Sequence, residues 1–406
     1  MSGSDAGGKS PGPLPTGPRA GYLSLASHVS LRRLEEPFLY DRRQDELYEL
    51  NEDAMRFLER INGVTPGLAA VADPEFLAYL LDEGLAVLAD RPGLRAPRRG
   101  GQPPPSLRYL ELYLTERCNL ACGHCFLGER TGRRSESPGH PRDLPAAAAR
   151  RVMDEFDAMG GLRLLLTGGE ALLHPDFWEL NERLPAYGFR SVLLSNGWLL
   201  ARSAPRLRVQ EVQVSLDGLE PAHDALRGRG SFVRALAGLD AAREVGLDIS
   251  VATMVHAADV GDFPAMAALV RQLGVRAWHV DVPSECGTLT GRADLLLPPA
   301  EAAPFLDYAF GGGTHDAIAG AVCGSHLMAV MPDGTAAKCG FFADRPVGAV
   351  ESGLAELWRR VPRGRAVDLA CACDHVAECH GGCRYRASTY NGEESPDPVQ
   401  CARYGV

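Results

Sequence analysis

The sequence predicts an α/β protein built on a partial (β/α)6, TIM-like barrel, with a winged-helix-like domain before it and a Cys-rich domain after it. Apolar strands alternate with amphipathic helices from residue 108 to about 284, which is typical of a parallel sheet covered by helices. Short strands followed by helices precede this region, and seven cysteines fall between residues 323 and 401. We expect a disordered start (1–21), the winged-helix-like domain (22–90), a linker (91–106), the barrel core (107–311) and the Cys-rich domain (312–406).

The N-terminal domain is predicted from turns, strands and helix caps. Three strands are expected, at residues 28–33, 37–41 and 46–50. Asn51 caps a predicted helix that ends at Ile61, and a second helix follows Pro74. Residues 91–106 are rich in Pro, Gly and Arg, which is typical of a linker.

The barrel core is predicted from six apolar strands, at residues 108–115, 162–169, 191–197, 211–218, 248–255 and 277–284. Helices are expected between most of them, for example at 145–160 and 230–246. Six strand-helix units suit an open partial barrel better than a closed barrel of eight units. In such folds, ligands bind at the carboxyl ends of the strands. Chemically distinctive residues follow the first four strands: Cys118, Cys122 and Cys125; Gly168, Gly169 and Glu170; Ser195 and Asn196; and Asp217.

The composition narrows the classes of function. A formal net charge of −10 argues against a general nucleic-acid binder, because neutralising phosphates requires a basic face. No stretch offers the roughly 18 apolar residues of a membrane span, and the start carries no signal-peptide core. We therefore expect a cytoplasmic protein without nucleic-acid or membrane partners, acting on small molecules, peptides or proteins.

Three thiols stand close together at Cys118, Cys122 and Cys125. Cytosolic thiols stay reduced and a chain of 406 residues does not need disulfides, so metal or redox chemistry explains them better. Four thiolates close a zinc site or fill every iron of a 4Fe-4S cluster, whereas three leave one iron open to bind and reduce a substrate. A buried or zinc-bound trio is the alternative.

The spacing C-x3-C-x2-C, followed by TGGE, LLSNG and QVSLDG at the ends of the next three strands, resembles the radical S-adenosylmethionine (SAM) superfamily. The resemblance implies a 4Fe-4S cluster on Cys118, Cys122 and Cys125 whose open iron binds SAM, which yields a 5′-deoxyadenosyl radical. It also implies a set of SAM-binding residues: His124, Gly168, Gly169, Glu170, Ser195 and Asp217. Taken singly, tight turns explain the glycines, and a helix cap or turn explains Asp217.

The Cys-rich tail resembles the SPASM extension of radical SAM enzymes, with Cys323-x10-Gly334-x4-Cys339 at its start. It departs from that pattern where one residue, rather than two, separates Cys371 from Cys373. The resemblance implies two auxiliary 4Fe-4S clusters, the nearer on Cys323, Cys339 and Cys383 and the farther on Cys371, Cys373, Cys379 and Cys401. The nearer cluster lacks one ligand, which Cys286 or a substrate thiolate could supply. A free buried Cys286 and a zinc-ribbon tail are the alternatives.

The N-terminal domain resembles the RiPP recognition element, a PqqD-like module that binds a leader peptide as an added strand. The three resemblances together imply a maturase that installs a thioether or carbon-carbon crosslink in a ribosomally synthesised precursor peptide. An external donor such as flavodoxin or ferredoxin would supply electrons, and epimerisation could replace crosslinking. One alternative is a SPASM enzyme acting on a folded protein, as sulfatase maturases do, or on a small molecule or tetrapyrrole. Another alternative for the whole chain is a non-catalytic iron-sulfur or zinc protein. For the N-terminal domain, the alternative is a purely structural or dimerising role.

Overall fold

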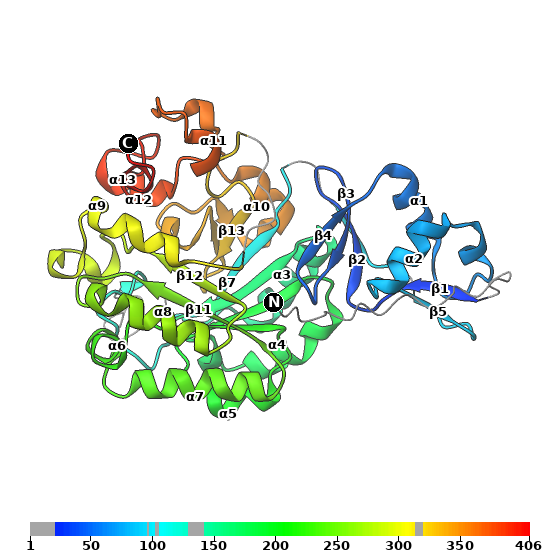
Figure 1. The fold of residues 1–406 in the computed structure, drawn as a ribbon, viewed down its shortest axis with the longest axis horizontal. Coiled ribbons are helices and arrows are strands. Elements are labelled where there is room, and N and C mark those ends of the chain that lie inside the picture. The colour runs from blue at the N-terminus through cyan, green and yellow to red at the C-terminus, as the bar shows by residue number, and fades with distance from the viewer. Residues whose placement is uncertain (1–20, 96, 102–104, 129–141, 313–319) are drawn as a thin grey trace, which may run out of the picture.

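The computed structural model describes residues 21–95, 97–101, 105–128, 142–312 and 320–406. The predicted disordered start therefore lies outside the described residues, apart from Gly21. Figure 1 shows the N-terminal domain beside a larger α/β body, with the C-terminal segment packed across one side of that body. Within the described residues, no helix is long and apolar enough to cross a membrane.

The N-terminal domain contains two small sheets and two helices around its own apolar core. One sheet pairs β1 (Tyr22–Leu25) with β5 (Ala86–Ala89), and the other has the order β4-β3-β2-β6. The remaining elements are β2 (Val29–Arg33), β3 (Pro37–Asp41), β4 (Glu46–Glu49), β6 (Arg99–Gly101), α1 (Glu52–Arg60), η1 (Leu68–Val71) and α2 (Pro74–Asp82). The predicted cap is present, because the Asn51 side chain accepts a hydrogen bond from the Ala54 N–H.

The segment predicted as a linker contains an ordered strand. Residues 99–101 form β6, which pairs in parallel with β2, and the Arg99 guanidinium donates to the Glu59 carbonyl at 2.8 Å. Gly100 lies so close to the backbone of Gly160 that a Cβ would approach its Cα to 2.5 Å. The strand depends on backbone pairing and close approach rather than on apolar side chains, so the composition did not indicate it.

The barrel sheet has the order β12-β11-β10-β9-β8-β7-β13-β14-β15. The six predicted barrel strands are present as β7 (Tyr109–Thr115), β8 (Arg163–Gly168), β9 (Arg190–Ser195), β10 (Glu211–Ser215), β11 (Asp248–Met254) and β12 (Ala277–Asp281). Neighbouring strands among these six are parallel, and within the described ranges no pairing joins β12 to β15. The sheet is therefore open, as predicted.

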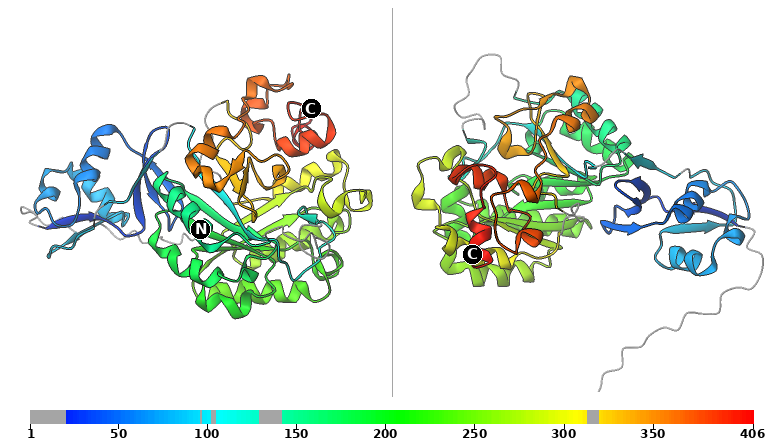
Figure 2. Two further views of the ribbon diagram at one scale, coloured as in Figure 1. Left: turned by 180° about the vertical axis from the view of Figure 1, so that it is seen from behind. Right: turned by 90° about the horizontal axis from the view of Figure 1, so that it is seen from above.

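Helices cover the outer face of the barrel sheet (Figures 1 and 2). They are α3 (Ala146–Ala158), α4 (Phe177–Arg183), α5 (Leu200–Ser203), α6 (Glu220–Arg227), α7 (Ser231–Glu244) and α8 (Phe263–Gln272). The short helix α9 (Pro299–Ala302) lies beside the C-terminal segment, where Ala302 packs with Val399. Outward-facing strand residues such as Leu110 and Leu164 pack with Val152 and Phe156 of α3 in the main core. Alternate strand residues face inward and are left to line the barrel interior.

The C-terminal segment continues the barrel sheet instead of standing apart from it. Strand β13 (Leu327–Val330) pairs in parallel with β7, and β14 (Thr335–Ala337) and β15 (Gly348–Ala349) follow in antiparallel order. Its helices are α10 (Leu354–Arg360), α11 (Val376–Cys379), α12 (Arg384–Tyr390) and α13 (Pro398–Arg403). These strands have four residues or fewer, too few to show a periodic pattern in the sequence.

The N-terminal domain is docked against the amino ends of the barrel strands (Figure 2). The Tyr40 hydroxyl lies 3.0 Å from the Leu162 carbonyl oxygen. Arg190, at the start of β9, donates to the carbonyl oxygens of Arg42 and Arg43 at 3.2 and 3.0 Å. The domain is therefore held at the end of the barrel opposite the first three cysteines.

Candidate cofactor and cluster site

The first three cysteines follow β7 and line a cavity of about 300 Å³ at the carboxyl ends of the barrel strands. Residues from β8 to β12 contribute the other walls, among them Gly168, Gly169, Ser195, Asn196, Ser215 and Met254. The structure thus brings together strand ends that lie far apart in the sequence.

The thiols of this loop lie among hydrogen-bond donors. Burial raises the pKa of Cys118 to about 11 and also raises the pKa of Cys122, so these two thiols stay protonated near neutral pH when no metal is bound. The Asn196 amide nitrogen lies 3.9 Å from the sulfur of Cys118, and an Arg227 nitrogen lies 4.0 Å from that of Cys122. Donors of this kind stabilise the thiolates that form when metal binds, so the donor set fits an iron-sulfur cluster.

The glycines after β8 allow close packing on the cysteine loop. The Gly169 N–H donates to the Thr115 carbonyl at 2.8 Å. A Cβ on Gly168 would lie 2.3 Å from that same oxygen, and one on Gly169 would lie 2.5 Å from the Arg117 oxygen. Close packing on the cysteine loop therefore requires both glycines, and both also line the cavity with backbone that a ligand can approach.

Glu170 lies behind the cavity wall and positions the end of β9. Its carboxylate accepts hydrogen bonds from the Ser195 hydroxyl at 3.1 Å and from the Asn196 N–H at 3.0 Å. Burial raises the pKa of Glu170, which is 1% exposed and does not line the cavity. Ser195 lines the cavity while its hydroxyl is held by Glu170.

Asp217 also lies behind the wall, in an ion pair with Arg227 of α6. Burial raises the pKa of Asp217, but the Arg227 charge, the nearby histidines and a hydrogen bond from the Met254 N–H together hold it well below its ordinary value. His124 Nε2 lies 3.3 Å from the Asp217 carboxylate, and burial lowers the pKa of His124 to about 4, so its ring is neutral. His124 lines the cavity, and its buried Nδ1 has no partner among the described residues.

The seven tail cysteines fall into two groups. Cys371, Cys373, Cys379 and Cys401 line one small pocket. The other group is Cys323, Cys339 and Cys383. Burial raises the pKa of Cys339 well above its ordinary value and the pKa of Cys383 to about 11, and the nearby Cys323 raises both of these pKa values further. Among the residues that the structure describes, no three His, Cys, Asp or Glu side chains are grouped to hold a single metal ion. In a cluster, by contrast, each thiolate binds a different iron.

Cys286 lies beside the first cysteine loop. It precedes η7 (Gly287–Leu289) and lines the 300 Å³ cavity. Two residues later, the Thr288 N–H donates to the Cys125 carbonyl at 3.0 Å. Burial raises the pKa of Cys286, a hydrogen bond with Tyr385 lowers it, and the Cys125 charge raises it.

The Radical SAM superfamily model matches residues 112–270. The mycofactocin maturase MftC of Mycobacterium ulcerans is 30% identical over 332 residues, which cover 72% of this chain and 87% of that protein. The AdoMet-dependent heme synthase of Nitratidesulfovibrio vulgaris is 24% identical over 362 residues, or 77% and 96% of the two chains. The fold and these matches define a radical SAM enzyme. The chain belongs to the radical SAM superfamily, which implies a 4Fe-4S cluster and SAM.

Solved structures show the same fold. Streptococcus suis SuiB bound to its precursor peptide SuiA superposes with a TM-score of 0.66 and 16% identity, covering 93% of this chain and 99% of that one. The structure of anSMEcpe with bound AdoMet gives a TM-score of 0.55 at 16% identity, with 73% and 94% covered.

Two residues at the site were missed or left without a role by sequence reasoning. Arg227 lies in α6, ten residues beyond Asp217, and belongs to no motif that the sequence shows. Asn196 was expected at a strand end, but only the folded chain places its amide beside Cys118. A polar residue directly after an apolar strand was the available signal for Asn196.

Proposed function

We propose that this radical SAM enzyme is a peptide maturase that crosslinks a ribosomally synthesised precursor peptide whose leader binds the N-terminal domain. The observation that carries the proposal is β4, the outer strand of the four-stranded sheet, which has no neighbour on its far side within the described residues. An unpaired strand edge is a template for an incoming extended peptide.

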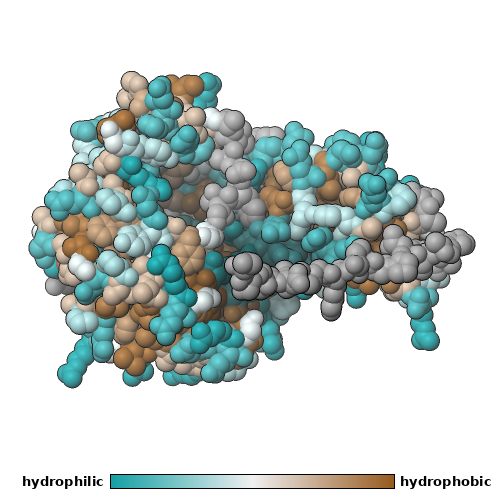
Figure 3. Space-filling model, viewed as in Figure 1, coloured by the Kyte–Doolittle hydropathy of each residue, from teal (hydrophilic) through white to brown (hydrophobic). Residues whose placement is uncertain are grey.

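Aromatic side chains flank this edge. Tyr48 of β4 meets Tyr79 of α2 edge to face, with ring centroids 6.4 Å apart, and Tyr79 is 45% exposed. Behind them Phe57 and Phe76 make a similar contact at 6.3 Å. Figure 3 shows hydrophobic residues breaking the hydrophilic cover of the N-terminal domain. A leader strand on β4 would gain backbone hydrogen bonds from the edge and apolar contacts from the tyrosines.

The barrel interior offers a path for the core peptide. A cavity of about 780 Å³ begins at Gln44, in the turn that leads into β4, and at Glu46, the first residue of β4. It shares Leu194 and Gln213 with the 300 Å³ cavity at the cysteines. A peptide held on β4 would therefore have an internal route toward the cysteine loop.

Different residues of the 300 Å³ cavity would bind the cluster, contact SAM and exclude water. Cys118, Cys122 and Cys125 would hold the 4Fe-4S cluster, which with SAM supplies a 5′-deoxyadenosyl radical that removes a hydrogen atom from the peptide. Gly169 would present backbone to SAM, and apolar Met254 would help to exclude water. His124, held by Asp217 and Arg227 at Nε2, would keep a neutral ring with Nδ1 free to form a hydrogen bond with the ligand.

The tail cysteines would hold two auxiliary clusters that carry electrons. Cys371, Cys373, Cys379 and Cys401 are half-buried, so the farther cluster would lie near the surface. An external donor such as flavodoxin or ferredoxin would approach there.

The comparisons support the peptide proposal and also a second candidate. One relative is named a mycofactocin maturase, and SuiB was solved with a precursor peptide. Two others are named AdoMet-dependent heme synthases, which favours chemistry on a tetrapyrrole as the alternative. An edge strand for a leader is needed only by the first candidate.

Binding of labelled peptides tests the proposal. The probes are synthetic copies of the short open reading frames beside the gene, titrated into the intact enzyme by fluorescence anisotropy. We expect micromolar or tighter binding of one probe, weakened at least about tenfold by Tyr79→Ala. Tyr390→Ala, which removes another exposed tyrosine from α12, is the matched control and should not change binding. Absence of binding, together with SAM-dependent consumption of an iron porphyrin, would favour the tetrapyrrole alternative.

A further inference from the structure

Glu111 places a carboxylate beside a proposed cluster ligand. It lies on the inner face of β7, and its Oε2 accepts hydrogen bonds from the Gly340 N–H at 2.8 Å and from the Tyr113 hydroxyl at 3.3 Å. Gly340 directly follows Cys339 and begins η10 (Gly340–Phe342), so the bonded backbone is the cysteine loop itself. Glu111 also lies close enough to Cys339 for the two side chains to interact electrostatically.

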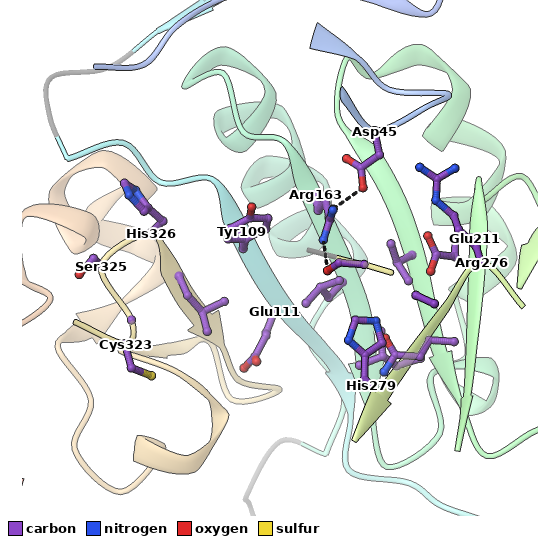
Figure 4. A pocket seen from close by; sticks show the side chains of 18 of the residues that line it. Asp45, Tyr109, Glu111, Arg163, Glu211, Arg276, His279, Cys323, Ser325 and His326 are labelled. Carbon is purple, nitrogen blue, oxygen red and sulfur yellow. Dashed lines mark hydrogen bonds and ion pairs between the residues drawn. The ribbon is translucent and has the colours of Figure 1, made fainter. Parts of the chain in front are cut away.

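The second oxygen of Glu111 remains available. Oε1 accepts no hydrogen bond from any described residue, and Glu111 lines the 780 Å³ cavity. Cys323 lines the same cavity, and Figure 4 shows its thiol and the Glu111 carboxylate directed into the space between β7 and the C-terminal segment. Cys323 also lies close enough to Cys339 and Cys383 to interact electrostatically with both. The Glu111 carboxylate and the Cys323 thiol therefore face the same space.

Other candidate ligands are engaged elsewhere. Cys286 lies beside Cys125 and Tyr385. The Asp281 carboxylate accepts from Arg386 at 2.9 Å and from the Val282 N–H at 2.8 Å.

His279 lines the same cavity, but its ring faces Gly312. Burial lowers the pKa of His279, and the charges that modify it are those of Glu211 and Arg163 rather than any cysteine. His279 is therefore a matched control for Glu111, since it borders the cavity without facing the thiols.

We propose that Glu111 is the fourth protein ligand of the nearer auxiliary cluster, completing the set of Cys323, Cys339 and Cys383. The inference rests on the proposed auxiliary clusters. A coordinate bond from Oε1 to the fourth iron requires no co-reactant and no change of oxidation state. The iron that three thiolates leave open is then closed to substrate thiolates, so this cluster transfers electrons instead of binding substrate.

Spectroscopy of the auxiliary clusters tests the assignment. The chain carrying Cys118→Ala, Cys122→Ala and Cys125→Ala is reconstituted anaerobically, so that only auxiliary clusters remain. Glu111→Gln keeps an oxygen for the Gly340 N–H but removes the anionic ligand, whereas Glu111→Ala opens the iron. We expect Glu111→Gln to raise the midpoint potential of one cluster, because an anionic ligand is lost. Added 2-mercaptoethanol should change the electron paramagnetic resonance spectrum of Glu111→Ala but not that of the background chain or of its His279→Gln derivative.

The outcomes separate the ligand from the clusters. Four irons or fewer in the background chain would overturn the auxiliary clusters themselves, and the ligand assignment with them. About eight irons with identical spectra and potentials in both Glu111 variants would overturn only the role of Glu111. A change in the spectrum of the background chain on addition of 2-mercaptoethanol would show that an iron is already open while Glu111 is present. That result would also overturn the role of Glu111.

Discussion

Arg227 lines the cysteine cavity and forms an ion pair with Asp217 behind its wall, with side chains that are 10% and 0% exposed. The pair holds a guanidinium 4.0 Å from the sulfur of Cys122, where its positive charge lowers the pKa of that thiol against the effect of burial. It therefore links the end of β10 to the loop that would hold the radical SAM cluster.

Asp217→Asn should destabilise the apo-protein by about 3 kcal/mol, because it leaves the Arg227 charge buried without an anionic partner. Urea unfolding measures the change. The matched control is Asp294→Asn, whose partner Arg292 is 47% exposed and whose own side chain is 63% exposed, so solvent screening should leave its effect much smaller. Equal effects of the two substitutions would contradict a buried structural role for the Arg227 pair.

His223 makes stability depend on pH. Its Nδ1 accepts the Asp217 N–H at 3.0 Å, and burial lowers its pKa from 6.5 to about 4. Between these values the unfolded chain binds more protons, so stability falls as the pH decreases through this window, by at most about 1.4 kcal/mol per pH unit. His223→Asn should show a shallower fall in urea midpoints measured across the same range. A slope unchanged by the substitution would rule out this contribution.

Arg190 should be essential for docking of the N-terminal domain. Its side chain is 1% exposed and bonds Glu211 at 2.9 Å as well as the Arg42 and Arg43 carbonyls. Arg190→Ala leaves these acceptors unpaired, so we expect a loss of about 3 kcal/mol and faster proteolytic release of the domain. Arg56→Ala, which breaks an exposed pair with Asp53, should do neither. Unchanged proteolysis of Arg190→Ala would mean that other contacts hold the domain.

Iron content should separate Cys286 from the tail cysteines. The reconstituted enzyme should carry about 12 irons, and Cys379→Ser should lose up to about four. Cys286→Ser should keep the full content, because Cys286 lies beside Cys125 and outside both tail groups. A loss of four irons in Cys286→Ser would make it a cluster ligand after all.

The sequence predicted those features that depend on long apolar patterns or on motifs. The runs that became β7 and β8 are long enough to show alternation with helices, and the three cysteines mark the end of β7. It did not predict β6 or β13, which are short and depend on backbone pairing with distant partners. Tertiary structure also decided which residues face the cavity.

Side-chain direction is the clearest case. Glu170 and Ser195 both stand at strand ends, and the sequence predicted that both bind SAM. Only Ser195 lines the cavity, because the Glu170 carboxylate turns back to bind the end of β9. Likewise, the proximity of Glu111 to Cys339 joins residues more than 200 positions apart. No local pattern encodes such a contact.

The most direct test of the account is mass spectrometry of the precursor peptide encoded beside the gene, after anaerobic incubation with dithionite-reduced enzyme and SAM. The account predicts release of 5′-deoxyadenosine together with a decrease in peptide mass equal to the hydrogens lost in forming a crosslink. The triple Cys118, Cys122 and Cys125→Ala variant should produce neither, and Tyr79→Ala should release 5′-deoxyadenosine while modifying little peptide. Equal release of 5′-deoxyadenosine by the triple variant, or an unmodified peptide with the intact enzyme, would contradict the account.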